Sequence, residues 1–119
     1  MIKLIRIEPS NNKNKKWSAF FNINDKEKKV DFGYKSKKDI KNDYTLHNDK
    51  QRRKNYLIRH KKDLNTNQPY RAGYLSIFIL WNDKSLEKSI NIYKSLLNKY
   101  NKGDKNVFKK YYEKLLNDF

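Results

Sequence analysis

Apolar residues are thinly spread along this chain except in one run, Tyr74–Trp81, where Ser76 is the single polar residue. A helix that is apolar all round is usually buried on several sides. Pro69 just before the run suits the first turn of a helix, because its missing N–H would be unpaired there anyway. We therefore predict a buried helix over residues 70–81, although its β-branched and aromatic residues also suit a buried strand. The run is too short to cross a bilayer, which takes about 20 such residues.

Alternating apolar and polar residues predict three strands before this run, at residues 2–7, 17–23 and 28–32. Trp17 and Phe21 fall on one face of the second strand, and Phe32 lies on the matching face of the third. The alternation changes phase within the first strand, so its core-facing side is ambiguous. Short turns between the strands favour an antiparallel meander over residues 1–33.

Helical spacing of apolar residues predicts further helices after the strands. A narrow stripe of Tyr56, Leu57 and His60 marks one that begins near Asp49, and wider stripes mark helices at 85–100 and 105–117. The predicted fold is α+β, with the meander packed against about four helices (43–117) in a single domain, 1–119. The expected core residues are Trp17, Phe21, Phe32, Tyr56, Leu57, His60, Leu75, Phe78, Ile79, Trp81, Leu86 and Ile90.

Composition changes this picture mainly through charge, because the chain carries a formal net charge of +16. Such a charge favours a polyanionic partner. Lysine, asparagine, isoleucine, tyrosine and phenylalanine share A/T-rich codons, however, so part of the charge reflects codon usage. The chain has no cysteine, which excludes disulfides, thiolate catalysis and cysteine-based metal sites. Its first ten residues lack the apolar stretch of a signal peptide, so we expect a protein that is not secreted.

Positive charge is densest between His47 and Lys62, where seven basic residues accompany one acid, Asp49. We predict that this segment binds a polyanion or a protein partner, and that the ring of Tyr44 stacks on a base or else belongs to the core. The predicted partner-binding residues are Lys50, Arg52, Arg53, Lys54, Arg59, Lys61, Lys62 and Tyr44.

Many residues between positions 32 and 90 together form a specific spacing pattern: Phe32, Gly33, Asp43, Tyr44, Thr45, His47, Asp49, Arg52 or Arg53, Lys54, Tyr56, Arg59, His60, Pro69, Ala72, Gly73, Ser76, Leu80, Trp81, Ser85, Leu86, Ser89 and Ile90. This pattern resembles a family of short uncharacterised proteins of nucleocytoplasmic large (giant) DNA viruses. The family has no assigned activity, so the resemblance implies no catalytic residues. It implies a viral protein located in the virion or in the viral factory of the host cytoplasm.

Histidine offers the main candidates for catalytic chemistry. A metal-dependent nuclease could use Asp43, His47 and Asp49. No second acidic pair and no glycine-rich phosphate loop supports that hypothesis. His60 lies on the apolar stripe, which suits a hydrogen-bonded packing residue. We therefore expect a protein that is not an enzyme and has no metal and no cofactor.

Two non-enzymatic functions remain. The first is a structural component of a large DNA virus particle, a minor capsid or cement-like protein that bridges larger subunits through their acidic surfaces. The second is a sequence-nonspecific nucleic-acid-binding protein that contacts DNA or RNA phosphates through the helix at 50–62. One continuous basic face would favour nucleic acid, whereas cations mixed with acids over several faces would favour the structural role.

Overall fold

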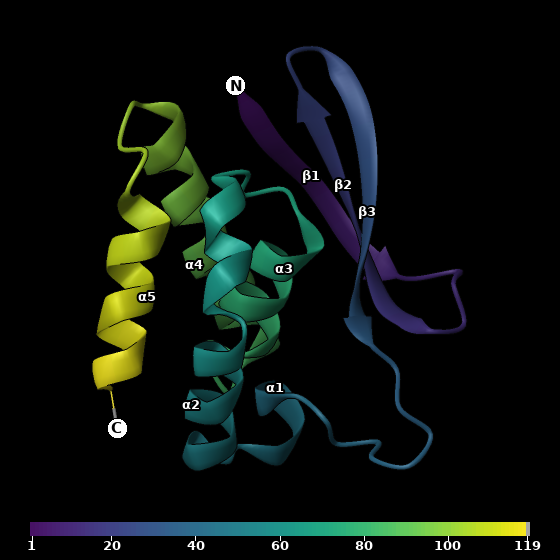
Figure 1. Cartoon of the computed structure of the whole chain (residues 1–119). Coiled ribbons are helices and arrows are strands. Elements are labelled where there is room, and N and C mark those ends of the chain that lie inside the picture. Colours follow the sequence, from purple (N-terminus) through teal and green to yellow (C-terminus); the bar gives the residue numbers. More distant parts are fainter. Residues whose placement is uncertain (119) are drawn as a thin grey trace.

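The computed structural model describes residues 1–118 and places a three-stranded antiparallel sheet beside a group of helices (Figure 1). The strands are β1 (Ile2–Pro9), β2 (Lys15–Ile23) and β3 (Lys26–Tyr34), in the order β1-β2-β3. The helices are α1 (Tyr44–His47), α2 (Lys50–Arg59), the 3₁₀ helix η1 (Lys61–Thr66), α3 (Ala72–Leu75), the π-helix η2 (Ser76–Leu80), α4 (Leu86–Asn101) and α5 (Val107–Asn117). This arrangement confirms the predicted α+β fold class. Within residues 1–118, no helix combines the length and apolar character needed to cross a membrane.

A β-bulge explains the change of phase in the first strand. The pairing between β1 and β2 shifts between Leu4 and Arg6, so Ile5 is an extra residue without a partner in the register. One inserted residue reverses the alternation of faces. Leu4 and Ile7 therefore both pack toward the core, while Ile5 is 49% exposed.

The hairpin between β2 and β3 is tighter than the predicted turn at 24–27. Asn24 and Asp25 alone form the loop, with φ angles of 51° and 68°. Positive φ at both central residues is the geometry that matches the twist of two paired strands, and Asn and Asp tolerate it better than most residues. Strand β3 therefore begins at Lys26 rather than at residue 28.

The apolar run lies at the centre of the molecule and is helical, but its second half is a π-helix. The N–H of Trp81 donates to the carbonyl of Ser76 at 3.1 Å, which closes a turn wider than an α turn. The consecutive residues Ile77, Phe78 and Ile79 have no exposed surface. They pack between the sheet, α4 and α5, so the run is buried on several sides as predicted.

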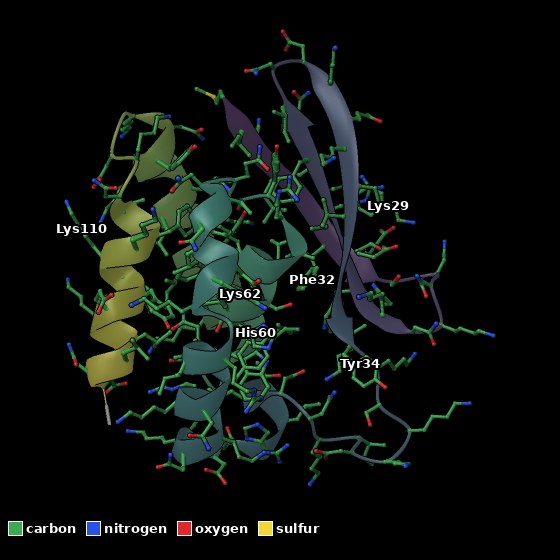
Figure 2. All side chains as sticks on the ribbon, viewed as in Figure 1. Lys29, Phe32, Tyr34, His60, Lys62 and Lys110 are labelled. Carbon is green, nitrogen blue, oxygen red and sulfur yellow. The ribbon has the colours of Figure 1, made fainter. Side chains whose placement is uncertain are left out.

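Most of the expected core side chains are inside the protein. Phe32 points from the sheet toward the helices (Figure 2). The buried members are Phe21, Phe32, Leu57, Leu75, Phe78, Ile79 and Trp81, and the members that are partly buried at the edge of the core are Trp17, Tyr56, Leu86 and Ile90. His60 directly follows the last residue of α2 and stays on the stripe, where its ring stacks on that of Tyr56 at 4.0 Å. It is partly buried at the edge of the core, and its Nδ1 lies 3.1 Å from a carboxylate oxygen of Asp63.

Two long-range contacts fasten the sheet to the helices at opposite ends. The Asn101 side chain of α4 accepts the N–H of Ile2 at 3.0 Å and donates to its carbonyl at 2.7 Å. At the other end, Lys16 of β2 forms an ion pair with Asp43, the residue that caps α1. The Lys16–Asp43 ion pair lies between two hollows in the surface.

Candidate binding surfaces

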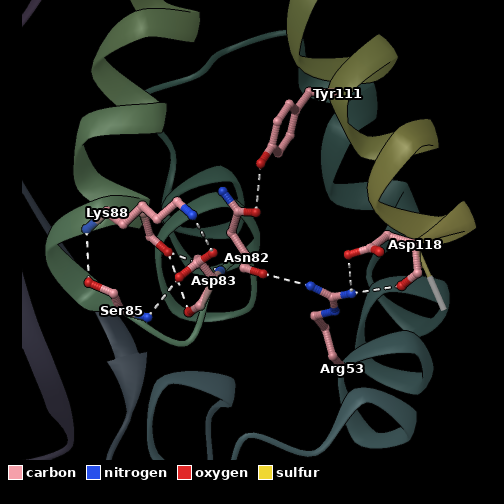
Figure 3. A network of polar contacts seen from close by, with 8 residues as sticks. Arg53, Asn82, Asp83, Ser85, Lys88, Tyr111 and Asp118 are labelled. Carbon is pink, nitrogen blue, oxygen red and sulfur yellow. Dashed lines mark hydrogen bonds and ion pairs between the residues drawn. The ribbon is translucent and has the colours of Figure 1, made fainter.

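Arg53, predicted to bind a partner, lies inside the protein and is only 4% exposed. Its guanidinium donates to the carbonyl of Asn82 at 2.7 Å, and to the carbonyl and a carboxylate oxygen of Asp118 at 2.8 and 3.1 Å (Figure 3). It also lies 4.7 Å from the ring centre of Tyr44, which is 2% exposed. Neither side chain is available to a phosphate or a base, so the expected partner-binding role is corrected for both, and Tyr44 takes the core position that was its alternative. The cause is that this side of α2 packs against the loop after η2 and against the end of α5.

The remaining cations of α2 are divided between two sides of the helix. Asp49 starts the helix by accepting the N–H groups of Gln51 and Arg52. Because an α-helix turns about 100° per residue, Lys50 and Arg52 point about 160° apart. Lys54 follows Lys50 by one turn and is partly buried. The predicted basic helix therefore does not present one continuous face.

Arg52 and Arg59 border a cavity of about 280 Å³ between α2 and the ends of β2 and β3. Asn55 and Tyr56 lie on the same side of α2, because these positions follow the i, i+3, i+4, i+7 spacing of one helix face. The other lining residues come from the sheet, the loop before α1, and η2: Lys16, Gly33, Tyr34, Asn42, Asp43, Ser76, Leu80 and Trp81. The cavity therefore combines positively charged side chains at its border with an apolar base.

A stack of aromatic rings supports this cavity. Tyr56 lies between His60 and Trp81, with ring centres 4.0 and 4.1 Å away, and Trp81 also contacts His47 at 5.2 Å. Burial raises the pKa of Tyr56 to about 12, so its hydroxyl stays protonated near neutral pH. Burial, followed by the charge of Arg52, lowers the pKa of His47. The Tyr56 ring is therefore uncharged near neutral pH, and its surroundings disfavour a charge on His47.

A second hollow, the lysine-bordered groove, lies on the other side of the Lys16–Asp43 ion pair. Its volume is about 380 Å³. The apolar members are Trp17 of β2, Leu46 of α1 and Leu86 of α4, and the remaining members are Lys16, Lys35, Asp43, Thr45 and Lys84. Leu46 is 44% exposed, which is high for a large apolar side chain. The groove combines an apolar surface with a border of lysines.

The carboxylates near His47 are engaged in local structure. Asp43 accepts the N–H and hydroxyl of Thr45 and pairs with Lys16, while Asp49 caps α2. His47 Nδ1 accepts the N–H of Asp49 at 2.9 Å. In the part of the chain that the structure describes, no group of three or more His, Cys, Asp or Glu side chains is placed to hold a metal ion.

Exposed charge is distributed over the whole molecule. Lys29 lies on the outer side of the sheet, Lys62 on η1 and Lys110 on the opposite edge at α5 (Figure 2). Acids are interleaved with these cations and form four exposed or half-exposed pairs on different elements: Arg6–Glu8, Arg52–Asp39, Lys88–Asp83 and Lys110–Asp104. Exposed cations are therefore mixed with acids over several faces and do not form one continuous basic face.

Sequence reasoning identified Arg52 and Arg59 but missed their neighbours in the cavity. The spacing of Arg52, Asn55, Tyr56 and Arg59 is a signal that could have shown them to share one side of α2. No local pattern indicates Lys16 or Asn42, because the fold brings them to α2 from other segments. The same holds for Lys35, Leu46 and Lys84 of the groove.

Comparison with known proteins yields one similarity. Residues 5–60, slightly less than half of the chain, match a family of unknown function, DUF5754. That range contains the sheet from the bulge onward, α1 and α2, and therefore most residues of the cavity. No curated protein and no solved structure matches this chain.

Proposed function

We propose that this chain is a non-enzymatic structural protein of a large DNA virus particle, a minor capsid or cement-like protein that binds acidic surfaces of larger virion proteins. The observation that carries the proposal is the lysine-bordered groove formed by Trp17, Leu46 and Leu86 together with Lys35 and Lys84. The viral context rests on the resemblance of residues 32–90, and it places the protein in the virion or in the viral factory of the host cytoplasm.

The groove has the chemistry of a protein interface. Protein–protein contacts combine an apolar, well-packed centre with a polar rim. Trp17 and Leu46 supply such a centre, and the exposed side chains of Lys35 and Lys84 supply positive charge at its border. A partner segment with one or two large apolar residues flanked by Asp or Glu would match both features.

The nucleic-acid alternative has less support from the same geometry. A protein that follows a phosphate backbone needs cations along one continuous groove or face. Here Arg53 and Tyr44 are buried, and Lys50 and Arg52 point to different sides of α2. Dispersed lysines mixed with acids suit many modest contacts with several neighbouring subunits instead.

A labelled acidic peptide tests the groove directly. The probe carries a central Leu-Phe pair flanked by glutamates, and its partner probe replaces that pair with serines at equal charge. We expect the apolar probe to bind more tightly at 0.15 M salt by fluorescence anisotropy, by about tenfold or more, because it buries two large side chains. Equal binding of the two probes would contradict a specific groove.

Matched variants separate the groove from general charge. Leu46→Ser with Lys35→Ala should abolish the preference for the apolar probe. Ile58→Ser with Lys62→Ala makes the same chemical change at another surface site, where Ile58 is 55% exposed, and should leave the preference intact. For the viral context, the protein should remain with particle shells after the genome is removed, and its loss with the genome would contradict the structural role.

A further inference from the structure

We infer that the cavity beside Arg52 and Arg59 is a binding site for a small molecule that carries a phosphate group. This inference goes beyond the proposed structural role and uses a different hollow, separated from the groove by the Lys16–Asp43 pair.

The balance of charge in the cavity is the first argument. Lys16, Arg52 and Arg59 line it with one carboxylate, Asp43, which is already paired with Lys16. Arg52 contacts Asp39 at 2.8 Å in an exposed ion pair, which is a weak kind of contact that a ligand can replace. Within residues 1–118, Arg59 forms no ion pair with a carboxylate. An anion would balance the two arginines.

The geometry of α2 is the second argument. Arg52 and Arg59 are two helical turns apart, about 10 Å along the axis, so their long side chains can approach one group from two directions. A guanidinium presents a planar fork of N–H donors that fits two phosphate oxygens at once. Asn55, between the two arginines on the same face, adds an uncharged donor.

The size and floor of the cavity limit the ligand. A volume of about 280 Å³ is near the lower end of the roughly 300–1,000 Å³ typical of small-molecule sites. Leu80 and Trp81 give the floor an apolar surface. Together these features fit a phosphate attached to one small, flat or ring-shaped group, such as a nucleoside monophosphate, free in solution or at the end of a nucleic acid.

Calorimetric titration at constant ionic strength tests this site with adenosine monophosphate, adenosine, succinate and inorganic phosphate. We expect saturable binding of adenosine monophosphate at a stoichiometry of one, weaker binding of inorganic phosphate, and at least about tenfold weaker binding of adenosine and succinate. Succinate binding as tightly, or no saturation with millimolar adenosine monophosphate, would overturn the inference.

One variant that keeps the net charge and one that lowers it make the test specific for a protein this basic. Arg52→Lys with Arg59→Lys retains both charges but loses both forks, so we expect affinity to fall about tenfold or more. Lys50→Ala with Lys62→Ala removes two charges from other parts of the surface and should change affinity by less than about twofold. Equal losses in the two variants would overturn the inference in favour of general charge attraction.

Two oligonucleotides, one with and one without a 5′-phosphate, distinguish the sources of the ligand. Tighter binding of the phosphorylated chain than of adenosine monophosphate assigns the site to nucleic-acid ends, and equal or weaker binding assigns it to free nucleotides. Circular dichroism of each variant confirms that it is folded. The groove variant Leu46→Ser with Lys35→Ala should bind adenosine monophosphate normally, so failure of the proposed function leaves this result unchanged.

Discussion

Arg53 shows how a residue in the most basic segment of the chain can serve the core. It precedes Leu57 by one helical turn and shares the buried side of α2 with it. Its guanidinium satisfies the buried carbonyl of Asn82, whose side chain in turn accepts the hydroxyl of Tyr111 at 2.9 Å (Figure 3). Arg53 thus connects α2, the loop after η2 and the end of α5.

Replacing Arg53 should therefore cost stability rather than binding. Arg53→Met keeps most of the apolar stem but leaves the Asn82 carbonyl buried without a donor, so we expect the free energy of unfolding to fall by about 2–3 kcal/mol. Arg52→Met removes only an exposed ion pair and should change it by less than about 0.5 kcal/mol. Urea unfolding followed by circular dichroism measures both. Similar small losses in the two variants would contradict a structural role for Arg53.

At the scale of elements, the end of β3 is shaped by its close approach to η2. Gly33 has a φ of 84°, and a Cβ added there would lie 2.9 Å from Cδ1 of Leu80 and 3.1 Å from Cβ of Lys16. Gly103, after α4, has a φ of 114° but has no atom within 4 Å of such a Cβ. The two glycines share a backbone requirement and differ in their surroundings.

This difference predicts unequal costs for the same substitution. Gly103→Ala should lower the free energy of unfolding by about 1 kcal/mol, the cost of a left-handed backbone for a residue with a Cβ. Gly33→Ala should cost about 2–4 kcal/mol, because overlap with Leu80 is added to the same strain. Thermal and urea unfolding measure the gap. Equal costs would show that the sheet and η2 can separate without penalty.

Periodicity predicted the three strands and the main helices, but neither the short helices α1 and η1 nor the local departures from regular geometry. In residues 2–7 the alternation of apolar and polar residues changes phase, so the sequence does not show which side faces the core. The bulge at Ile5 resolves this, because it places Leu4 and Ile7 on one face. The apolar run predicts burial on all sides, yet nothing in its composition separates a π-helix from an α-helix. The spacing of His60 predicts its place on the stripe of α2, where it stacks on Tyr56, but not its contact with Asp63 of η1.

The candidate surfaces were less predictable than the fold for a physical reason. Residue type and spacing along one helix show Arg52, Tyr56 and Arg59 on a common side. The facing wall of the cavity, with Lys16 and Asn42, depends on how β2 and the loop before α1 meet that helix. Long-range packing of this kind leaves no mark in a local pattern.

At the scale of the whole molecule, a formal net charge of +16 guarantees some attraction to any polyanion, so binding alone does not identify a function. The informative measurement is how much the salt dependence of DNA binding changes when cations are removed from one part of the surface or from another. If one face binds phosphates, only its cations reduce the slope of log affinity against log salt when replaced. If the attraction is general, every set of exposed cations contributes alike.

We therefore expect two quadruple alanine variants to behave alike with random-sequence duplex DNA. One removes Lys50, Arg52, Arg59 and Lys62 around α2, and the other removes Lys3, Lys29, Lys99 and Lys114, which are exposed on the sheet, α4 and α5. Each should weaken binding and lower the salt slope by a similar amount, at most about 0.9 for each phosphate that is no longer neutralised. An effect confined to the first variant would mean that α2 reads a phosphate backbone despite its divided cations, and the nucleic-acid function would then replace the structural one.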